Sequence, residues 1–295
     1  MVIVLRRAAT AATDAACHVV GRRQVVRAAR FALLRARLDV PNDRTTNGEI
    51  LLATAALRLT PPGQAFQVVD AGANAGQWAR LMLDAAQLAG RIDDLDLHSF
   101  EPSSYTFGRL SEALDGQPVT LKQAALGEQP GSATLHVLMP GAGTNSLHRM
   151  PGWSDKGITE QVPLMTLEAY ADEAGLDHVM LLKVDTEGHD LAVLRGARRL
   201  FADQRISIAQ FEYNHRWVYA RFFLRDAFEL LTPIGYRIGK LTPFGVEFYP
   251  GWDAELESFV EGNYVACTKE VAERLPSVRW WKAAAREPDD RCDNR

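Results

Sequence analysis

Short apolar runs alternate with helical stretches from about residue 65 to residue 269, and this alternation limits the fold more than any other feature. The apolar runs with strand character are 67–70, 96–101, 119–126, 179–185, 206–213, 236–241 and 264–268, with two shorter candidates at 132–138 and 161–167. Strands that alternate with helices pack as a mostly parallel sheet with helices on both faces. The sequence therefore predicts a doubly wound α/β fold with a mostly parallel seven-stranded sheet, whose last two strands form an antiparallel edge pair.

The length of 295 residues suits one large domain with an extension. We predict an N-terminal helical extension over 1–60, a main domain over 61–270 and a polar C-terminal tail over 271–295. No apolar run approaches the roughly 20 residues that cross a bilayer, and Arg6 and Arg7 come too early for a signal-peptide core. The expected location is therefore the cytoplasm. The three cysteines are scattered and fit neither a disulfide framework nor a zinc site.

Charge is unevenly spread along the chain. Residues 1–40 hold eight Arg and two Asp, a net charge of +6, whereas the remaining residues carry −10. An acidic body argues against a nucleic-acid partner, because phosphate contacts dominate that affinity. The basic arm could touch an anionic membrane surface or the acidic body of another subunit, or it could be a solvated or core-packed helix. We therefore expect no nucleic acid and no transmembrane segment, and we keep a homo-oligomer formed through the N-terminal helices as an option.

The first predicted strand ends in a turn of small residues, Asp70-Ala-Gly-Ala-Asn-Ala-Gly76. Small residues let the chain turn sharply and let a ligand approach the backbone. A dinucleotide-binding turn would read G-x-G-x-x-G, but here the glycines are Gly72 and Gly76, and Asn74 occupies the middle position. An acid that precedes the first glycine gives the D-x-G-x-x-x-G form of a site for S-adenosylmethionine (SAM). In such a site Asp70 can face the ammonium of the methionine part.

Two further strand ends add candidate cofactor residues. Glu101 ends the second strand, where a carboxylate can accept both ribose hydroxyls of a nucleoside. The third strand ends in small residues that include Ala125, which could lie against an adenine face. Capping of the next helix by Glu101 and simple strand packing by Ala125 are the structural alternatives. Because dehydrogenases also use such a carboxylate, Glu101 does not by itself choose the cofactor.

Acidic residues and a histidine follow the next two strands. Asp185 and Glu187 lie at the carboxyl end of the most apolar strand, and Glu212 and His215 follow its neighbour. Open α/β sheets bind ligands at this edge. A hydroxyl acceptor needs a base, and an unperturbed imidazole titrates near neutral pH, so His215 is the first candidate. Asp185 or Glu212 could serve instead, or hold a magnesium ion, although the absence of a dense acidic cluster does not favour a metal.

The sequence resembles the FkbM-type methyltransferases over about residues 45–268. The resemblance implies a SAM-binding class I methyltransferase fold and, usually, O-methylation of sugars, polyketides or other natural products. It assigns Asp70, Gly72, Asn74, Gly76 and Glu101 to the cofactor and Asp185, Glu187 and Glu212 to the acceptor side, and it adds Glu49, in an upstream element, as a further candidate cofactor residue. His189 stands where the family usually has a small residue. The matching stretches are 69–76, 100–102, 145–147, 162–167, 182–191, 193–197, 211–212 and, upstream, 47–49.

The predicted function is therefore a SAM-dependent O-methyltransferase acting on a hydroxyl of a sugar, glycolipid or other natural product. The acceptor expected from this is a small molecule or a glycan. A Rossmann-type oxidoreductase or epimerase is the alternative enzyme class, but the chain lacks a G-x-G-x-x-G turn. A non-catalytic SAM-binding protein is the third option, and the intact acidic rim argues against it.

Overall fold

The computed structural model describes residues 2–39, 43–139, 141, 143–150 and 157–282. The chain forms two compact units, one over Met1–Pro41 and one over Asn42–Arg295. The sequence placed the end of the extension near residue 60, so the first unit is shorter than that boundary implied.

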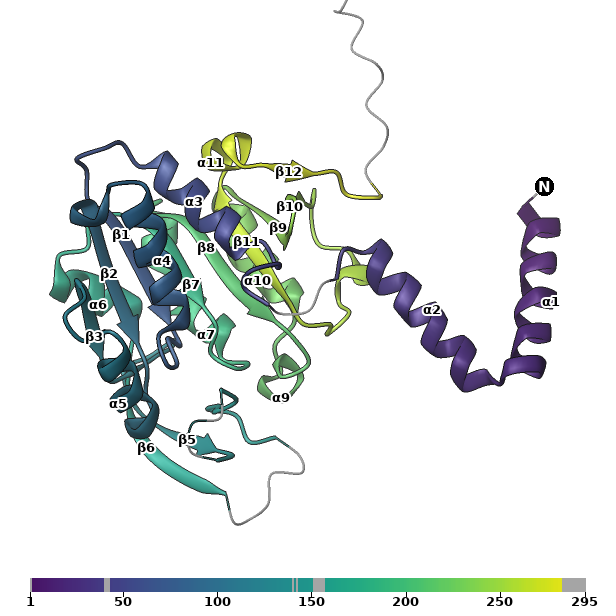
Figure 1. The fold of residues 1–295 in the computed structure, drawn as a ribbon, viewed down its shortest axis with the longest axis horizontal. Coiled ribbons are helices and arrows are strands. Elements are labelled where there is room, and N and C mark those ends of the chain that lie inside the picture. Colours follow the sequence, from purple (N-terminus) through teal and green to yellow (C-terminus); the bar gives the residue numbers. More distant parts are fainter. Residues whose placement is uncertain (1, 40–42, 140, 142, 151–156, 283–295) are drawn as a thin grey trace, which may run out of the picture. The chain divides into compact units, whose positions relative to one another are not determined.

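The first unit consists of two helices, α1 (Val2–Val20) and α2 (Arg22–Ala36), which contact each other (Figure 1). Gly21 separates them with a φ of 88°, a left-handed value that glycine adopts without cost. No residue of α2 is buried, and Val26, Phe31 and Leu33 are largely exposed. The helices predicted for this segment are therefore present as two separate elements with solvent-facing apolar side chains.

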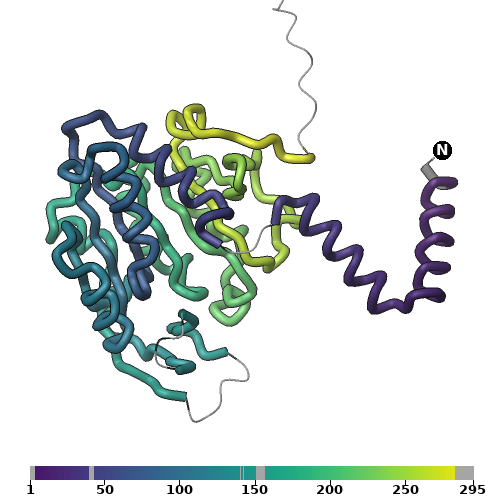
Figure 2. Tube along the Cα trace, viewed as in Figure 1, coloured from purple at the N-terminus to yellow at the C-terminus, as the bar shows by residue number. Residues whose placement is uncertain are grey.

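A nine-stranded sheet forms the centre of the second unit (Figures 1 and 2). Its strand order is β12-β10-β9-β11-β8-β7-β1-β2-β3. The strands are β1 (Phe66–Ala71), β2 (Leu95–Phe100), β3 (Val119–Lys122), β7 (Val179–Val184), β8 (Ile206–Tyr213), β9 (Tyr236–Thr242), β10 (Gly245–Phe248), β11 (Gly262–Thr268) and β12 (Ser277–Val278).

Strand directions agree with the doubly wound fold that the sequence predicts. β3, β2, β1, β7 and β8 run parallel, and β11 lies antiparallel between β8 and β9. The seven strands from β3 to β9 match the seven expected, and the short strands β10 and β12 extend the edge beyond β9. The order of strands reverses between β1 and β7, which is the position where open α/β sheets bind ligands.

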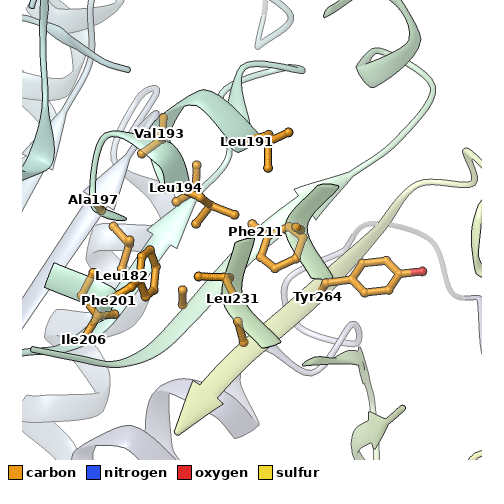
Figure 3. Close-up of a cluster of buried hydrophobic side chains, with 14 of the residues drawn as sticks. Leu182, Leu191, Val193, Leu194, Ala197, Phe201, Ile206, Phe211, Leu231 and Tyr264 are labelled. Carbon is orange, nitrogen blue, oxygen red and sulfur yellow. The ribbon is translucent and has the colours of Figure 1, made fainter. Parts of the chain in front are cut away.

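Helices cover both faces of the sheet. One face is covered by α3, α4, α5 and α11, and the other by α6, α7, α8 and α10. Neighbouring residues of one strand serve opposite faces, since Leu181 packs on the first and Leu182 on the second. Figure 3 shows the second core, where Leu194, Phe211 and Leu231 lie together. The helices are α3 (Glu49–Leu59), α4 (Gln77–Leu88), α5 (Ser104–Ala113), α6 (Leu167–Ala174), α7 (Asp190–Arg195), α8 (Arg198–Ala202), α9 (Trp217–Ala220), α10 (Leu224–Leu231) and α11 (Lys269–Arg274).

A separate three-stranded sheet has the order β4-β6-β5, from β4 (Ala125–Leu126), β5 (Gly131–Val137) and β6 (Ile158–Met165). The sequence indicated one strand over 119–126, but the segment forms two strands in different sheets. β3 ends the main sheet, and β4 belongs to this smaller sheet. The break brings Ala124, Ala125 and Leu126 against the end of the main sheet. All three are buried, and they line the cleft described below.

The predicted domain ends differ from the observed packing at two places. α3 packs on α4 and β7, so it belongs to the sheet unit although the sequence grouped it with the extension. α11 and β12 also pack with the sheet, and the rest of the predicted tail, 283–295, lies outside the described residues. Across the described part of the chain, none of the helices has the length and apolar character required to span a bilayer.

Candidate active site

The turn after β1 is built on glycines that no other residue could replace without strain. Gly72 has a φ of 85°, and a Cβ atom there would lie 2.0 Å from the backbone oxygen of Asp185. The backbone N–H groups of Gly72 and Ala73 both donate to the Phe100 oxygen, at 3.0 and 2.8 Å. Gly76, with a φ of 81°, precedes α4. The turn therefore presses the ends of β1, β2 and β7 together.

Glu101 follows β2 and is only 6% exposed. Its Oε2 accepts from the Asn74 N–H at 3.1 Å, and its Oε1 accepts from the Ser103 N–H at 3.0 Å. Burial raises the pKa of this carboxyl to about 7, although the two backbone N–H donors oppose the rise. Each oxygen has accepted only one bond within the protein, so the carboxylate can still accept two hydroxyl donors.

A buried lysine links the acids after β1 and β7. Lys183 Nζ lies 3.2 Å from Asp70 Oδ1 and 3.4 Å from Asp185 Oδ2, and 5.8 Å from the centre of the Trp78 ring. Burial alone would lower the pKa of Lys183, but the attraction of Asp70, Asp185 and Glu49 outweighs it and raises the pKa. Burial also raises the pKa of Asp70, which is 0% exposed, against the opposing pull of Lys183. Asp70 thus faces an ammonium of the protein itself.

These elements surround a cleft at the carboxyl ends of β1, β2 and β7. Of the residues predicted from the sequence, six line it: Gly72, Asn74, Glu101, Ala125, Asp185 and Glu187. Five others do not, and these are Asp70, Gly76, Glu49, Glu212 and His215. Lys183 and Trp78 complete the wall beneath the turn.

Glu187 lies in the turn after β7 with a φ of 57°, which is uncommon for a residue other than glycine. Its Oε2 forms an ion pair of 2.6 Å with Arg216. Burial raises the pKa of Glu187 to about 8, with repulsion from Asp185 adding to the rise. The neighbouring Asp190 is fully buried and accepts from the Thr186 and Gly188 N–H groups, both at 3.1 Å, and burial raises its pKa to about 7. The carboxyl groups at this edge of the cleft therefore outnumber the cationic side chains that pair with them.

Glu212 and His215 lie outside the cleft. Glu212 is 3% exposed, and its Oε2 accepts from Asn214 Nδ2 at 2.5 Å. Burial, reinforced by repulsion from Asp185 and other acids, raises its pKa well above the ordinary value. His215 is exposed on the loop that follows β8. The structure therefore does not bring His215 to the cleft, and its role as base stays a prediction without support from this geometry.

Glu49 is buried at the start of α3 and tied to the sheet. Its Oε1 accepts from Gln210 Nε2 on β8 at 2.6 Å and from Asn263 Nδ2 on β11 at 3.5 Å. Burial raises its pKa, and Lys183 opposes the rise. These contacts anchor α3 across two strands, and Glu49 takes part in the charge network below the cleft without lining it.

The comparisons with known proteins name the family. Residues 70–238, more than half of the chain, match the methyltransferase FkbM domain. The chain belongs to the FkbM methyltransferase family. The doubly wound sheet described above agrees with the class I, SAM-dependent methyltransferase fold expected of this family. None of the curated proteins matches the chain.

Solved structures resemble this FkbM methyltransferase only distantly. An FkbM methyltransferase from Methylobacillus flagellatus KT shares 16% identity over 69% of this chain, with a TM-score of 0.44, and the match spans only 43% of its length. A TehB-like SAM-dependent methyltransferase from Corynebacterium glutamicum shares 13% identity over 82% of this chain and 96% of its own, with a TM-score of 0.35. A SAM-dependent methyltransferase from Agrobacterium tumefaciens shares 9% over 74% and 60%, with a TM-score of 0.39. The assignment rests on the family match and on the strand order.

Sequence reasoning missed several residues in the cleft or beside it. Lys183 lies in the matching stretch 182–191, two residues before Asp185. Side chains two residues apart on a strand point to the same side, so this spacing could have indicated an internal partner for the acids. Arg216 and His148 gave no sequence signal, because only the fold brings their loops to the turn after β7. Over the ranges that the structure describes, no group of three or more His, Cys, Asp or Glu residues could hold a metal ion.

Proposed function

We propose that this chain binds SAM in the cleft and methylates a hydroxyl oxygen of a polyhydroxylated small molecule, such as a sugar, a glycolipid or another natural product. The observation that carries the proposal is the combination of Glu101 after β2 with Asp185 and Glu187 after β7 around one cleft. The first carboxylate suits a ribose, and the acidic edge suits a cationic methyl donor. Both lie at the sheet position where ligands bind in such folds.

The cleft's charge fits SAM. Glu101 and Glu187 both have pKa values raised by burial, to about 7 and about 8. Such groups gain most from a cation that replaces the lost water, and SAM brings a sulfonium and an ammonium. Ala124, Ala125 and Leu126 offer a small apolar surface for an adenine ring. The turn after β1 lacks the G-x-G-x-x-G spacing that binds the pyrophosphate of a dinucleotide, which favours SAM over NAD.

The residues' task in the reaction is mainly positioning. Bound SAM supplies an electrophilic methyl group on a sulfonium. The protein must hold the acceptor oxygen about 3 Å from that carbon and in line with the breaking bond. Asp185, held at 3.4 Å from Lys183, lies at the end of β7 with its side chain partly open to the cleft. It can orient an acceptor hydroxyl by accepting a hydrogen bond.

The wall of the cleft suits a ligand with several hydroxyls. Besides Glu187, whose carboxylate pairs with Arg216, four lining residues carry a buried polar atom without a hydrogen-bond partner: Trp78 Nε1, Asn145 Oδ1, Thr186 Oγ1 and His189 Nε2. Buried polar atoms are nearly always paired, so such atoms beside a cleft are typical of groups completed by a ligand. The hydroxyls of a polyol can donate to Asn145 Oδ1 and His189 Nε2, accept from the Trp78 N–H, and do either with Thr186 Oγ1. This feature supports the sugar-like acceptor within the broader class of natural products.

Isothermal titration calorimetry tests whether the chain binds SAM. Purified protein should bind SAM and S-adenosylhomocysteine (SAH), and it should bind neither NAD nor NADP. Glu101→Ala should weaken SAH binding by roughly 1–3 kcal/mol, since it removes a partner of buried polar groups. Glu112→Gln on the exposed side of α5 is a matched control that should bind normally. Unchanged SAH affinity in Glu101→Ala would remove Glu101 from the cofactor site.

Assays of methyl transfer test whether the acceptor is a hydroxyl oxygen. Tritiated SAM should label alkyl glycosides with free hydroxyls, and Asp185→Asn and Glu187→Gln should lower the rate while Glu112→Gln does not. His215 and Glu212 remain candidates for the base, and magnesium remains an option that EDTA would reveal by abolishing transfer. Transfer only to an amine or a carbon acceptor would overturn the O-methylation proposal while leaving SAM binding intact.

We also propose that the N-terminal helices mediate a homo-oligomer. The support is the exposure of apolar side chains on α1 and α2, including Leu5, Val26 and Phe31, together with the +6 charge of residues 1–40 against the −10 of the remainder. Apolar helix faces left in water favour association, and opposite charges on the two parts favour contact between copies.

A further inference from the structure

Two histidines from distant parts of the chain meet at the edge of the cleft. His148 lies in the segment between β5 and β6, and His189 lies directly before α7. His148 Nε2 is 3.1 Å from His189 Nδ1, and the ring centres are 5.2 Å apart. The other nitrogen of His189, Nε2, is buried, has no hydrogen-bond partner and belongs to a residue that lines the cleft.

The pair is held by contacts on each side. Ser146 Oγ accepts from the His148 N–H at 3.1 Å and donates to the Glu187 carbonyl at 2.7 Å. These bonds fix the His148 segment to the turn after β7. The edge of the Phe222 ring packs against His148, with ring centres 6.1 Å apart. The contact between the two imidazoles is therefore a built feature of the fold.

A glycine packs closely against the unpaired nitrogen. A Cβ atom at Gly127 would lie 2.9 Å from His189 Nε2 and 2.9 Å from Leu164 Cδ1. Real Cβ atoms do not come that close, so any other residue at this position would crowd the nitrogen. His189 stands where the FkbM resemblance leads one to expect a small residue, and the imidazole therefore adds a polar group to this wall of the cleft.

We propose that His189 is the base that takes the proton from the acceptor hydroxyl, and that His148 positions it by accepting a hydrogen bond from His189 Nδ1–H. The proposal rests on the O-methylation proposed above. An imidazole that donates through Nδ1 must present a lone pair at Nε2, because neutral histidine carries one N–H. A buried orphan acceptor is also less costly than a buried orphan N–H, which favours the same tautomer.

The proton and electron balance closes at His189. As the acceptor oxygen forms its bond to the methyl carbon, the carbon–sulfur bond breaks and its electron pair stays on sulfur, giving SAH. The hydroxyl proton moves to His189 Nε2, while the Nδ1 proton stays in its hydrogen bond to His148 Nε2. After the methylated product leaves, the Nε2 proton passes to water that enters the cleft, which restores the neutral Nδ1–H tautomer for the next turnover.

The other groups near the acceptor side are already engaged. Glu187 forms its ion pair with Arg216, and Asp190 accepts two backbone N–H bonds. Asp185 is paired with Lys183. Burial lowers the pKa of His189 to about 4, with His148 adding to the effect, so the imidazole is unprotonated at neutral pH but is a weaker base than an ordinary histidine. It takes the proton as the acceptor oxygen bonds to the methyl carbon, because that bond makes the hydroxyl strongly acidic.

Nuclear magnetic resonance tests the tautomer without any acceptor. In ¹⁵N-histidine protein saturated with SAH, long-range proton–nitrogen correlations should show His189 protonated at Nδ1 and bare at Nε2. His148→Gln, which can still accept from Nδ1–H, should keep this tautomer, whereas His148→Phe should lose the preference. A His189 that carries its proton on Nε2 in the SAH complex would overturn the proposal.

Rates of methyl transfer from tritiated SAM to alkyl glycosides test the role. His189→Gln should lower turnover by about 10²–10⁴ and leave SAH affinity nearly unchanged. His148→Phe should lower turnover less, with His148→Gln between it and the native enzyme. His178→Gln, at the opposite end of β7, is the matched control and should behave as native.

The outcomes separate this inference from the proposed function. If the native enzyme transfers to oxygen but His189→Gln is equally fast, the base is misassigned while O-methylation stands. A large loss in His215→Ala with none in His189→Gln would move the role to His215. If the native enzyme binds SAH but methylates no hydroxyl, O-methylation fails, and the role of His189 as base fails with it.

Discussion

Lowering the pH from 8 to 6 should weaken SAH binding about tenfold, and Glu101 is the reason. The carboxyl is 6% exposed, and burial raises its pKa to about 7. To accept two ribose hydroxyls it must be ionised, because a protonated carboxyl offers fewer acceptor sites and a donor of its own. The cofactor therefore binds the ionised form and competes with a proton.

The magnitude follows from the fraction of protein that is ready to bind. For a pKa of about 7, roughly nine-tenths of the carboxyl is ionised at pH 8 and roughly one-tenth at pH 6, and the apparent affinity scales with that fraction. The sign is fixed because a raised pKa means that the free protein holds the proton and the complex releases it. Affinity rises with pH and levels off above about pH 8. Near pH 6 each bound SAH should release about one proton.

Calorimetry in two buffers of different ionisation enthalpy measures both affinity and released protons. SAH is the better probe than SAM, because it lacks the sulfonium charge that also acts on Glu187. Glu101→Gln cannot ionise, so its weaker binding should be nearly independent of pH, whereas Glu112→Gln should follow the native curve. A native affinity that stays flat between pH 6 and 8, or a Glu101→Gln variant that keeps the slope, would refute the reasoning.

Three further outcomes are expected. Phe211→Ala should lower the free energy of unfolding by about 3–5 kcal/mol in urea titrations, because the ring is fully buried against Trp217 and Tyr264, and a smaller change would mean that the core refills the space. The pKa of Glu187 is raised to about 8, so its contribution to stability is present below the pKa of the unfolded chain and is lost as pH rises through 8. The native protein without cofactor should therefore lose more unfolding free energy from pH 5 to 9 than Glu187→Gln does. Equal losses in the two proteins would contradict this. Deletion of residues 1–41 should reduce the mass of the assembly in light scattering, and an unchanged mass would exclude the proposed interface.

The proposed cofactor side of the cleft could be predicted because its residues follow directly after strand ends. The pattern Asp70 to Gly76 already specifies a strand, a sharp turn and a helix, and the structure has β1, a positive-φ glycine and α4 in those places. Glu101 follows from the same rule at β2. Local pattern was sufficient wherever one strand and its following turn carry the group.

The acceptor side could not be predicted because it is assembled from distant segments. Arg216 reaches Glu187 from the loop after β8, and His148 reaches His189 from the small sheet. Nothing in the residues around 148 or 216 encodes those partners. The same limit explains His215, which sequence spacing placed on the rim with Glu212 but which the loop after β8 leaves exposed.

The demand for glycine at position 72 gives a sharp test of the turn, because the chain supplies a matched control. Gly72 and Gly63 both have positive φ, 85° and 78°, so alanine at either costs about 1–2 kcal/mol from backbone strain alone. Around Gly63 a Cβ would meet nothing within 4 Å, whereas at Gly72 it would meet the backbone oxygen of Asp185 at 2.0 Å. That oxygen lies directly after a central strand and cannot move without displacing the residues that line the cleft.

Gly63→Ala should therefore lose only the strain energy and keep its SAH affinity. Gly72→Ala should lose more stability in urea titrations and at least tenfold in SAH affinity, because the shift displaces Asp185 and the N–H groups that fix the turn to Phe100. Circular dichroism separates a variant that folds but binds weakly from one that does not fold. Equal stability losses with native SAH affinity in both variants would mean that the turn relaxes freely, and the cleft would then not depend on contact between β1 and β7.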